Sequence, residues 1–406
     1  MKRSYTYIML IVNIFLLGCT EPYPIASENF EELLVVNATL TDSLQYQTVR
    51  LTNSYPLNTD TLVYVNNATV YIRDNNNQIF NFSQVANDST YISDMPFKAV
   101  ENASYSLHIT TQDGREYQST EETTPQKVTI DNLYAEARTN QQGVEGVQIY
   151  TDVTGTNNNN LYCRYEYDET FKIVTPYTVY ADMEFSERVY FYNSFLDCWY
   201  YFYYIMLHPV EEQTKIGYKT NTSNTIVLAN NSQLISNTIN KVENKFIPKD
   251  DYVISERYSF LVYVYSENYQ AYQYFETLKK LNSQESSLSP NQPGFIQGNI
   301  SNVSNQEKII GYFNVASVKT KRIFFDFSNF GFSKPAYFSE CYVNEYDYRD
   351  KCALGIYNAD LLYYDANTRN YRLVNIVEDG IYTLVNPECA DCTTFASNVK
   401  PDFWED

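Results

Sequence analysis

The sequence predicts a mainly β protein in which an N-terminal β-sandwich is followed by a larger, β-sandwich-like domain with one prominent helix. Tyr and Phe are abundant, with 41 and 23 copies in 406 residues, and both favour strands. Short apolar segments alternate with turn clusters of Asn, Asp and Gly along most of the chain. A clear helical spacing of apolar residues occurs once, after residue 266.

The start of the chain predicts export and a lipid anchor. Lys2 and Arg3 precede a short apolar run over residues 8–17, and Gly18-Cys19 follows it. This order is typical of a secretory signal peptide. A Cys directly after Leu-Leu-Gly indicates a lipoprotein, so we expect cleavage before Cys19 and acylation of that residue. An uncleaved anchor, or a plain signal peptide with a chance Cys, is the alternative. The predicted segments are a signal peptide over residues 1–18 and a lipidated tether over residues 19–32.

Residues 33–124 read as a sandwich of short strands. Asp74-Asn75-Asn76-Asn77 and Asp113-Gly114 each lie between two apolar segments and predict two hairpins. About seven strands in about 100 residues fit an immunoglobulin-like fold. The polar segment around Pro125 marks the boundary, because proline interrupts strand pairing.

Residues 128–406 form the second predicted domain, again rich in strands. Within it, Ala271, Phe275 and Leu278 follow a helical spacing, with Ser266 as the expected N-cap. Two further strands are expected at residues 308–318 and 321–327.

The most aromatic stretch lies at residues 189–207, where Asp197 is the one charged residue. Tyrosines and Asn193 argue against a transmembrane helix there. Two readings are open: core strands, or an exposed surface that binds a partner or ligand. For the second reading, the candidate contacts are Trp199, Tyr201 and Tyr203.

Six cysteines remain once Cys19 is set aside, and an even number in an exported chain suggests disulfides. The simplest pairing joins neighbours in sequence, although fifteen pairings exist. Cys389-Ala390-Asp391-Cys392 also resembles a redox or zinc motif, but no second such motif or nearby His completes a zinc site. The pairs expected are Cys163 with Cys198, Cys341 with Cys352, and Cys389 with Cys392.

Charge and motifs narrow the function. A formal charge of −20 makes nucleic acid a poor partner. Two histidines, His108 and His208, lie far apart in sequence, and no nucleotide, metal or nucleophile motif is present. We therefore expect no catalytic residues, no metal and no cofactor. Three Asp-Ser/Thr tripeptides resemble O-glycosylation signals of exported proteins. Their acceptors are Ser43, Thr61 and Ser89.

An ordered series of short motifs resembles a known family of Bacteroidota lipoproteins, domain-of-unknown-function family 4249. The series runs through Glu256-Arg257-Tyr258, Pro293-Gly294-Phe295, Gly311-Tyr312-Phe313, Lys321-Arg322-Ile323-Phe324, Cys389-Ala390-Asp391-Cys392 and Pro401-Asp402-Phe403-Trp404.

The resemblance implies an outer-membrane lipoprotein that works beside a TonB-dependent receptor. It implies no catalytic residues. We therefore expect a non-enzymatic accessory protein, docked on a transporter or binding a small molecule, peptide or glycan for uptake. It would be anchored by lipid on the periplasmic or the outer face of the outer membrane. An adhesion or envelope-structural protein is the first alternative, and a hydrolase of surface glycans or peptides, using a pair of carboxylates, is the second.

Overall fold

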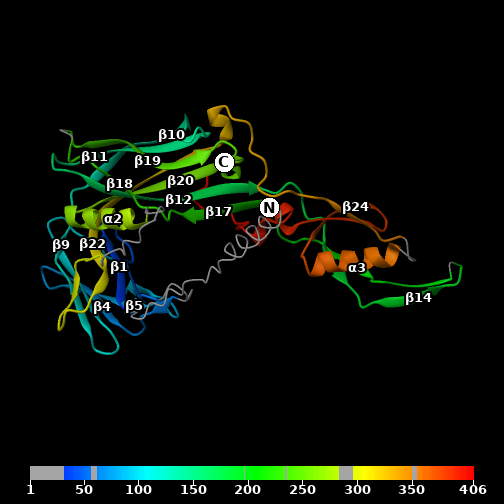
Figure 1. Cartoon of the computed structure of the whole chain (residues 1–406), viewed down its shortest axis with the longest axis horizontal. Helices are drawn as coiled ribbons and strands as arrows, with labels where there is room; N and C mark the ends of the chain where they lie inside the picture. The colour runs from blue at the N-terminus through cyan, green and yellow to red at the C-terminus, as the bar shows by residue number, and fades with distance from the viewer. Residues whose placement is uncertain (1–31, 56–61, 196, 234–235, 283–295, 350–353) are drawn as a thin grey trace, which may run out of the picture.

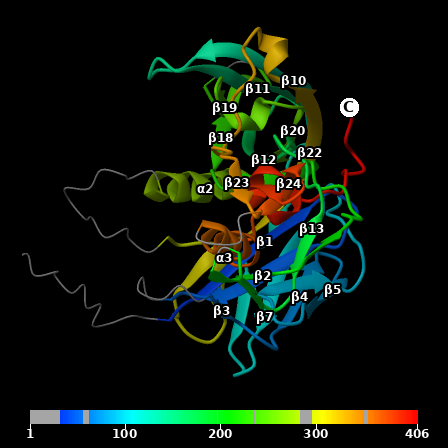
Figure 2. The ribbon, with the colours of Figure 1, turned by 90° about the vertical axis from the view of Figure 1, so that its right-hand side faces the viewer.

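The computed structural model describes residues 32–55, 62–195, 197–233, 236–282, 296–349 and 354–406. In these residues the backbone is mainly strand, which confirms the predicted fold class. Two stacked sandwiches occupy one end of a long molecule, and a narrower extension occupies the other (Figures 1 and 2). Within the same residues, no helix combines the length and apolar character needed to cross a bilayer.

The first sandwich contains both predicted hairpins. The turn between β4 and β5 has Asn77 at a φ of +61°, and the turn between β7 and β8 has Gly114 at +84°. Asn and Gly tolerate this left-handed backbone better than other residues, so these turns form where the sequence places them. The strands are β1 (Leu34–Thr41), β2 (Thr48–Asn53), β3 (Val63–Tyr64), β4 (Thr69–Asp74), β5 (Ile79–Gln84), β6 (Thr90–Ser93), β7 (Ser104–Thr110), β8 (Glu116–Ser119) and β9 (Glu122–Thr123).

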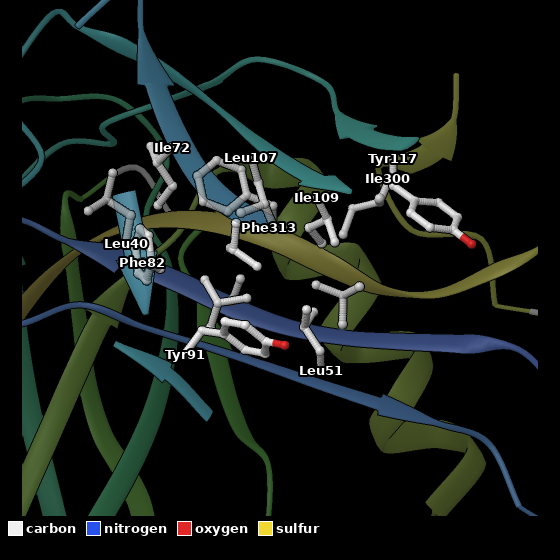
Figure 3. Packing of buried hydrophobic residues seen from close by; sticks show 14 of the residues in the cluster. Leu40, Leu51, Ile72, Phe82, Tyr91, Leu107, Ile109, Tyr117, Ile300 and Phe313 are labelled. Carbon is white, nitrogen blue, oxygen red and sulfur yellow. The ribbon is translucent and has the colours of Figure 1, made fainter. Parts of the chain in front are cut away.

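Two strands from far along the chain complete this sandwich. β21 (Ile300–Asn302) pairs antiparallel with β8, and the first half of β22 (Ile309–Phe325) pairs parallel with β1. Ile300 and Phe313 are buried in the same core as Leu51 and Leu107 (Figure 3). The boundary predicted near residue 124 therefore assigns two strands of the first sandwich to the second domain.

β22 is one continuous strand where the sequence suggested two. Its first half pairs with β1 as far as Ala316, and from Ser317 onward it pairs with β20 (Tyr258–Ser266). The gap between the two predicted strands, at residues 319 and 320, lies inside β22. The strand passes from one sandwich to the other just before this gap.

The second sandwich encloses a separate core. Cys163 and Tyr165 point into it from one strand and are fully buried, on the face where alternation places them. A three-stranded sheet of β10 (Val128–Thr139), β11 (Glu145–Gly155) and β19 (Thr238–Pro248) forms one layer. The facing layer comprises β12 (Tyr162–Val174), β17 (Ile216–Thr222), β18 (Val227–Asn230), β20 and the second half of β22.

The predicted helix is α2 (Tyr269–Asn282). Ala271 is buried, and Phe275 and Leu278 are half-buried, as their spacing suggests. Ser266 is not its N-cap, because that residue is the last of β20. The backbone carbonyl of Asn268 instead accepts the first helical hydrogen bond, from the amide of Tyr272.

A smaller unit follows near the C-terminus, and its helix was not predicted. α3 (Leu354–Asn367) packs beside a sheet of β23 (Asn344–Asp347), β24 (Arg372–Glu378) and β25 (Ile381–Val385). Gly355 and Asn358 are weak helix formers, so propensity alone does not indicate a helix there. Leu362 and Leu373 are central in its small core.

The disulfide pairing expected from sequence is wrong. Cys341 bonds to Cys389, with 5.7 Å between their Cα atoms, whereas Cys163 and Cys392 are free and buried. Cys163 lies on a core strand of the second sandwich. Cys392 packs against Gly217 on β17. Proximity in sequence therefore did not place sulfur atoms together. Cys198 is disulfide-bonded, and Cys352 lies outside the described residues.

Candidate functional site

The aromatic stretch singled out in the sequence forms a long hairpin that projects from the molecule. Two nested strand pairs build it, and the outer pair extends to the end farthest from the first sandwich (Figure 1). We call residues 182–208 the aromatic arm. Its strands are β13 (Asp182–Phe185), β14 (Val189–Asn193), β15 (Cys198–Phe202) and β16 (Ile205–His208).

Both faces of the outer pair carry exposed aromatic rings. On one face Tyr192 lies opposite Trp199, with ring centroids 5.3 Å apart, and Tyr190 lies opposite Tyr201 at 5.4 Å. On the other face Phe191 stacks on Phe202. Trp199 is 69 % exposed, and Phe195 at the tip is 93 % exposed. Aromatic pairs across strands stabilise the hairpin itself, but they leave its surface uncovered.

The root of the arm is fixed to the C-terminal unit through Asp360 of α3. Arg188 bonds this carboxylate at 3.0 Å, and the hydroxyl of Tyr203 donates to it at 3.1 Å. The hydroxyl of Tyr201 donates to the same group. Burial, followed by this bond to Asp360, raises the pKa of Tyr201 to about 12. An isolated two-stranded hairpin is only marginally stable, so these contacts hold the arm in place.

Tyr203 is an anchor of the arm and not an exposed contact. It is 4 % exposed, and its ring stacks on Tyr363 of α3 with centroids 4.7 Å apart. Its backbone amide donates to the hydroxyl of Tyr348 at 2.6 Å, and that hydroxyl donates back to its carbonyl at 2.9 Å. The structure therefore removes Tyr203 from the predicted contacts. Trp199 remains accessible to a partner, whereas Tyr201 is half-buried.

Sequence reasoning missed the residues that position the arm. Arg188, Tyr348 and Asp360 are ordinary polar residues in sequence, and two of them lie about 150 residues from the hairpin. A signal was available in the paired tyrosines Tyr363 and Tyr364, which follow two leucines. That pattern resembled the rest of a tyrosine-rich chain and did not stand out.

The two histidines lie in different parts of the molecule. His108 on β7 stacks on Tyr71 and hydrogen-bonds the hydroxyl of Ser106 at 3.0 Å. Burial, and after it the charge of Arg73, lower the pKa of His108. His208 is exposed at the base of the arm and bonds Glu184 at 2.7 Å. Among the described residues, no cluster of three or more potential metal ligands occurs.

The remaining predicted sites have mixed placements. Cys19 and Thr61 lie outside the described residues, and Ser43 lies in a half-buried bend. Ser89 is 4 % exposed, and its hydroxyl donates to Asp88. A glycan on Ser89 would require the surrounding turn to open, whereas Ser43 needs a smaller rearrangement.

Comparison with known proteins found a match to one family model. The family model described as "Domain of unknown function (DUF4249)" matches residues 20–322. That range includes the first sandwich, the aromatic arm and most of the second sandwich, because it ends within β22. Cys389-Ala390-Asp391-Cys392 and the final residues, which contributed to the resemblance seen in sequence, lie beyond the match. No curated protein matches the chain.

Proposed function

This chain belongs to the DUF4249 family, whose function is unassigned, and from its arm and N-terminal sequence we propose that it is a non-enzymatic outer-membrane lipoprotein. Acyl chains on Cys19 hold it to the membrane. It serves a transporter of the TonB-dependent class, on which it docks through the aromatic arm.

The exposed aromatic arm is the observation that carries this proposal. Burying apolar surface contributes about 25 cal/mol per Å², and uncovered rings on both faces of the arm leave that contribution available to a partner. Tyr and Trp are also enriched among the residues that dominate binding at protein interfaces. Trp199 and Tyr192, at the outer end, are therefore the expected centre of contact.

The anchoring of the arm supports docking over a structural role for the rings. Asp360, Arg188 and Tyr203 hold the root, so the outer pair is presented in a fixed orientation. A preorganised hairpin loses little conformational entropy on binding. Since Asp197 is the one charged residue at 189–207, shape and apolar contact would guide this association more than charge.

The proposal is tested by purifying the full-length lipoprotein from native outer membranes in mild detergent and identifying its companions by mass spectrometry. A stoichiometric TonB-dependent receptor is the expected result. Trp199→Ala with Tyr192→Ala should remove it, because both rings are exposed and neither belongs to the core of a sandwich. Tyr46→Ala, at a 57 % exposed tyrosine of the first sandwich, is the matched control and should retain it.

Recovery of a solitary protein, with lipid on Cys19 and in good yield, would contradict the transporter role. An adhesion or envelope-structural function would then be the better reading, because the same arm could bind another surface component. Equal loss of the receptor in the Tyr46→Ala control would contradict the assignment of the arm.

A further inference from the structure

A cavity of about 550 Å³ lies apart from the arm, at the end of the second sandwich. It forms where β12 and β17 meet η1 (Tyr252–Ile254) and the segments η3 (Pro387–Cys389) and η4 (Cys392–Thr394). Its size is in the usual range for small-molecule sites. All of its lining residues belong to the described part of the chain.

Four aromatic rings line the cavity, and three of them lie close together. Phe338 lies 5.1 Å from Tyr252 and 5.3 Å from Phe395 between ring centroids, at interplanar angles of 61° and 72°. Phe171 of β12 adds a fourth ring. Phe338 is 51 % exposed although it has these neighbours, so part of its surface is open to an occupant. Ring faces carry negative charge density, which attracts cations and disfavours anions.

Two carboxylates, of Asp251 and Glu388, line the same cavity. Asp251 accepts a hydrogen bond from the amide of Val253 at 3.1 Å, and Glu388 accepts one from the hydroxyl of Ser339 at 3.2 Å. Both side chains are half-buried, and no ion pair of either is found among the described residues. Lys219 lines the rim, is exposed, and likewise forms no ion pair there.

We propose that this cavity binds a small organic cation, an alkyl- or quaternary ammonium group with an apolar body. The rings would enclose the apolar part and face the positive charge, as in other aromatic sites for ammonium ligands. Asp251 and Glu388 supply the counter-charge, so the lining has a formal charge of −1 with Lys219 included. The charge of −20 on the whole chain also favours cations over anions in the field around the site. This inference does not depend on the function proposed for the arm.

The test is isothermal titration calorimetry of the full chain with benzyltrimethylammonium. Benzoate, an anion with a similar aromatic body, is titrated for comparison. The cation should bind and benzoate should not at the same concentration. Asp251→Asn and Glu388→Gln should each weaken the cation roughly three- to tenfold, because they remove charge. Both amides keep an acceptor for the existing hydrogen bonds, so the fold is retained. Phe338→Ala should weaken binding about threefold.

Lys219→Gln best distinguishes a site for cations from a site for anions. Loss of this positive charge should strengthen the binding of a cation and weaken the binding of an anion. Removal of its charge should tighten benzyltrimethylammonium about threefold. Glu136→Gln, an exposed carboxylate on β10 away from the cavity, is the control for net charge and should change nothing. The proposal is overturned if the cation does not bind, if Glu136→Gln matches the cavity variants, or if benzoate binds and Lys219→Gln weakens it.

Discussion

The first sandwich and the aromatic arm use the same kinds of side chain in opposite ways. In the sandwich Tyr91 and Tyr117 are 1 % exposed, and their hydroxyls bond the carbonyl of Val65 and the carboxylate of Glu307. In the arm Tyr190 and Trp199 are more than 60 % exposed. Aromatic composition therefore indicates strands in both regions, but it does not tell whether a ring is part of a core or of a surface.

Gly311→Ala should have the largest effect and should break the sandwich alone. Gly311 has a φ of +135°, and an added Cβ would lie 2.0 Å from the carbonyl oxygen of Val36 on the paired β1. We expect a loss of about 4 kcal/mol or more in the free energy of unfolding, measured by urea denaturation. Gly114→Ala is the control. It also has positive φ but meets no atom within 4 Å, and should cost about 1 kcal/mol. Equal losses of stability in the two variants would contradict the explanation that an added Cβ at Gly311 collides with β1.

Tyr203→Phe should loosen the arm and spare the sandwich. It removes the hydroxyl that accepts from Arg188 at 2.8 Å and donates to Asp360, at a cost of about 1 to 2 kcal/mol. Hydrogen exchange should quicken at residues 182–208 and stay unchanged in β1 and β7. Tyr204→Phe, at a 56 % exposed neighbour, is the matched control. Uniform acceleration over the whole chain would contradict a local anchor.

Alkaline pH should weaken both regions over the same interval. Burial raises the pKa of Tyr117 in the sandwich and of Tyr201 in the arm to about 12, from the ordinary value of 10.0. A raised tyrosine pKa stabilises the folded state fully below pH 10, and this contribution disappears as the pH rises to about 12, because the unfolded chain loses the proton first. Denaturation curves across that interval should show the loss, and Tyr201→Phe should reduce it. An unchanged slope in Tyr201→Phe would contradict the raised pKa.

The smallest expected effect is on tryptophan fluorescence. The chain has two tryptophans, one exposed and one buried. Trp199 is 69 % exposed in the arm, and Trp404 is 5 % exposed against Tyr218. Acrylamide should quench Trp199 strongly in the Trp404→Phe variant, and quench Trp404 weakly in Trp199→Phe. Trp199→Phe should change stability by less than about 0.5 kcal/mol. Weak quenching of Trp199 would show that the arm is covered.

The features that could be predicted from sequence are local elements, whose formation depends on residues close together in the chain. The turns at Asn77 and Gly114 and the spacing of Ala271 and Phe275 are local signals, and these elements form as expected. Cys163 and Tyr165 also share one face of β12, as strand alternation requires, and both are buried. In each case the rule operates within a few residues of the chain.

The remainder depends on contacts between distant segments. Val36 pairs with Gly311, and Cys341 bonds Cys389 across 48 residues. The bond from Tyr203 to Asp360 spans 157 residues and uses a helix that propensity did not indicate. Sequence reasoning proposed Trp199 and Tyr203 alike as contacts, but Trp199 is exposed and Tyr203 is buried. The sequence does not distinguish Trp199 from Tyr203, four residues further on. Tyr203 is buried because α3 places Tyr363 against its ring.

The shared strand β22 sets an order on folding. The first sandwich contains residues from 34 onward, but its core stays open until residues 309–316 reach β1. During synthesis, roughly three quarters of the 406 residues must therefore be made before the first-made part can close. Unpaired β1 is a sheet edge in the meantime, and long-range parallel pairing forms slowly. Chaperones should accordingly engage this protein through its N-terminal half, and truncation before residue 309 should leave that half unable to fold.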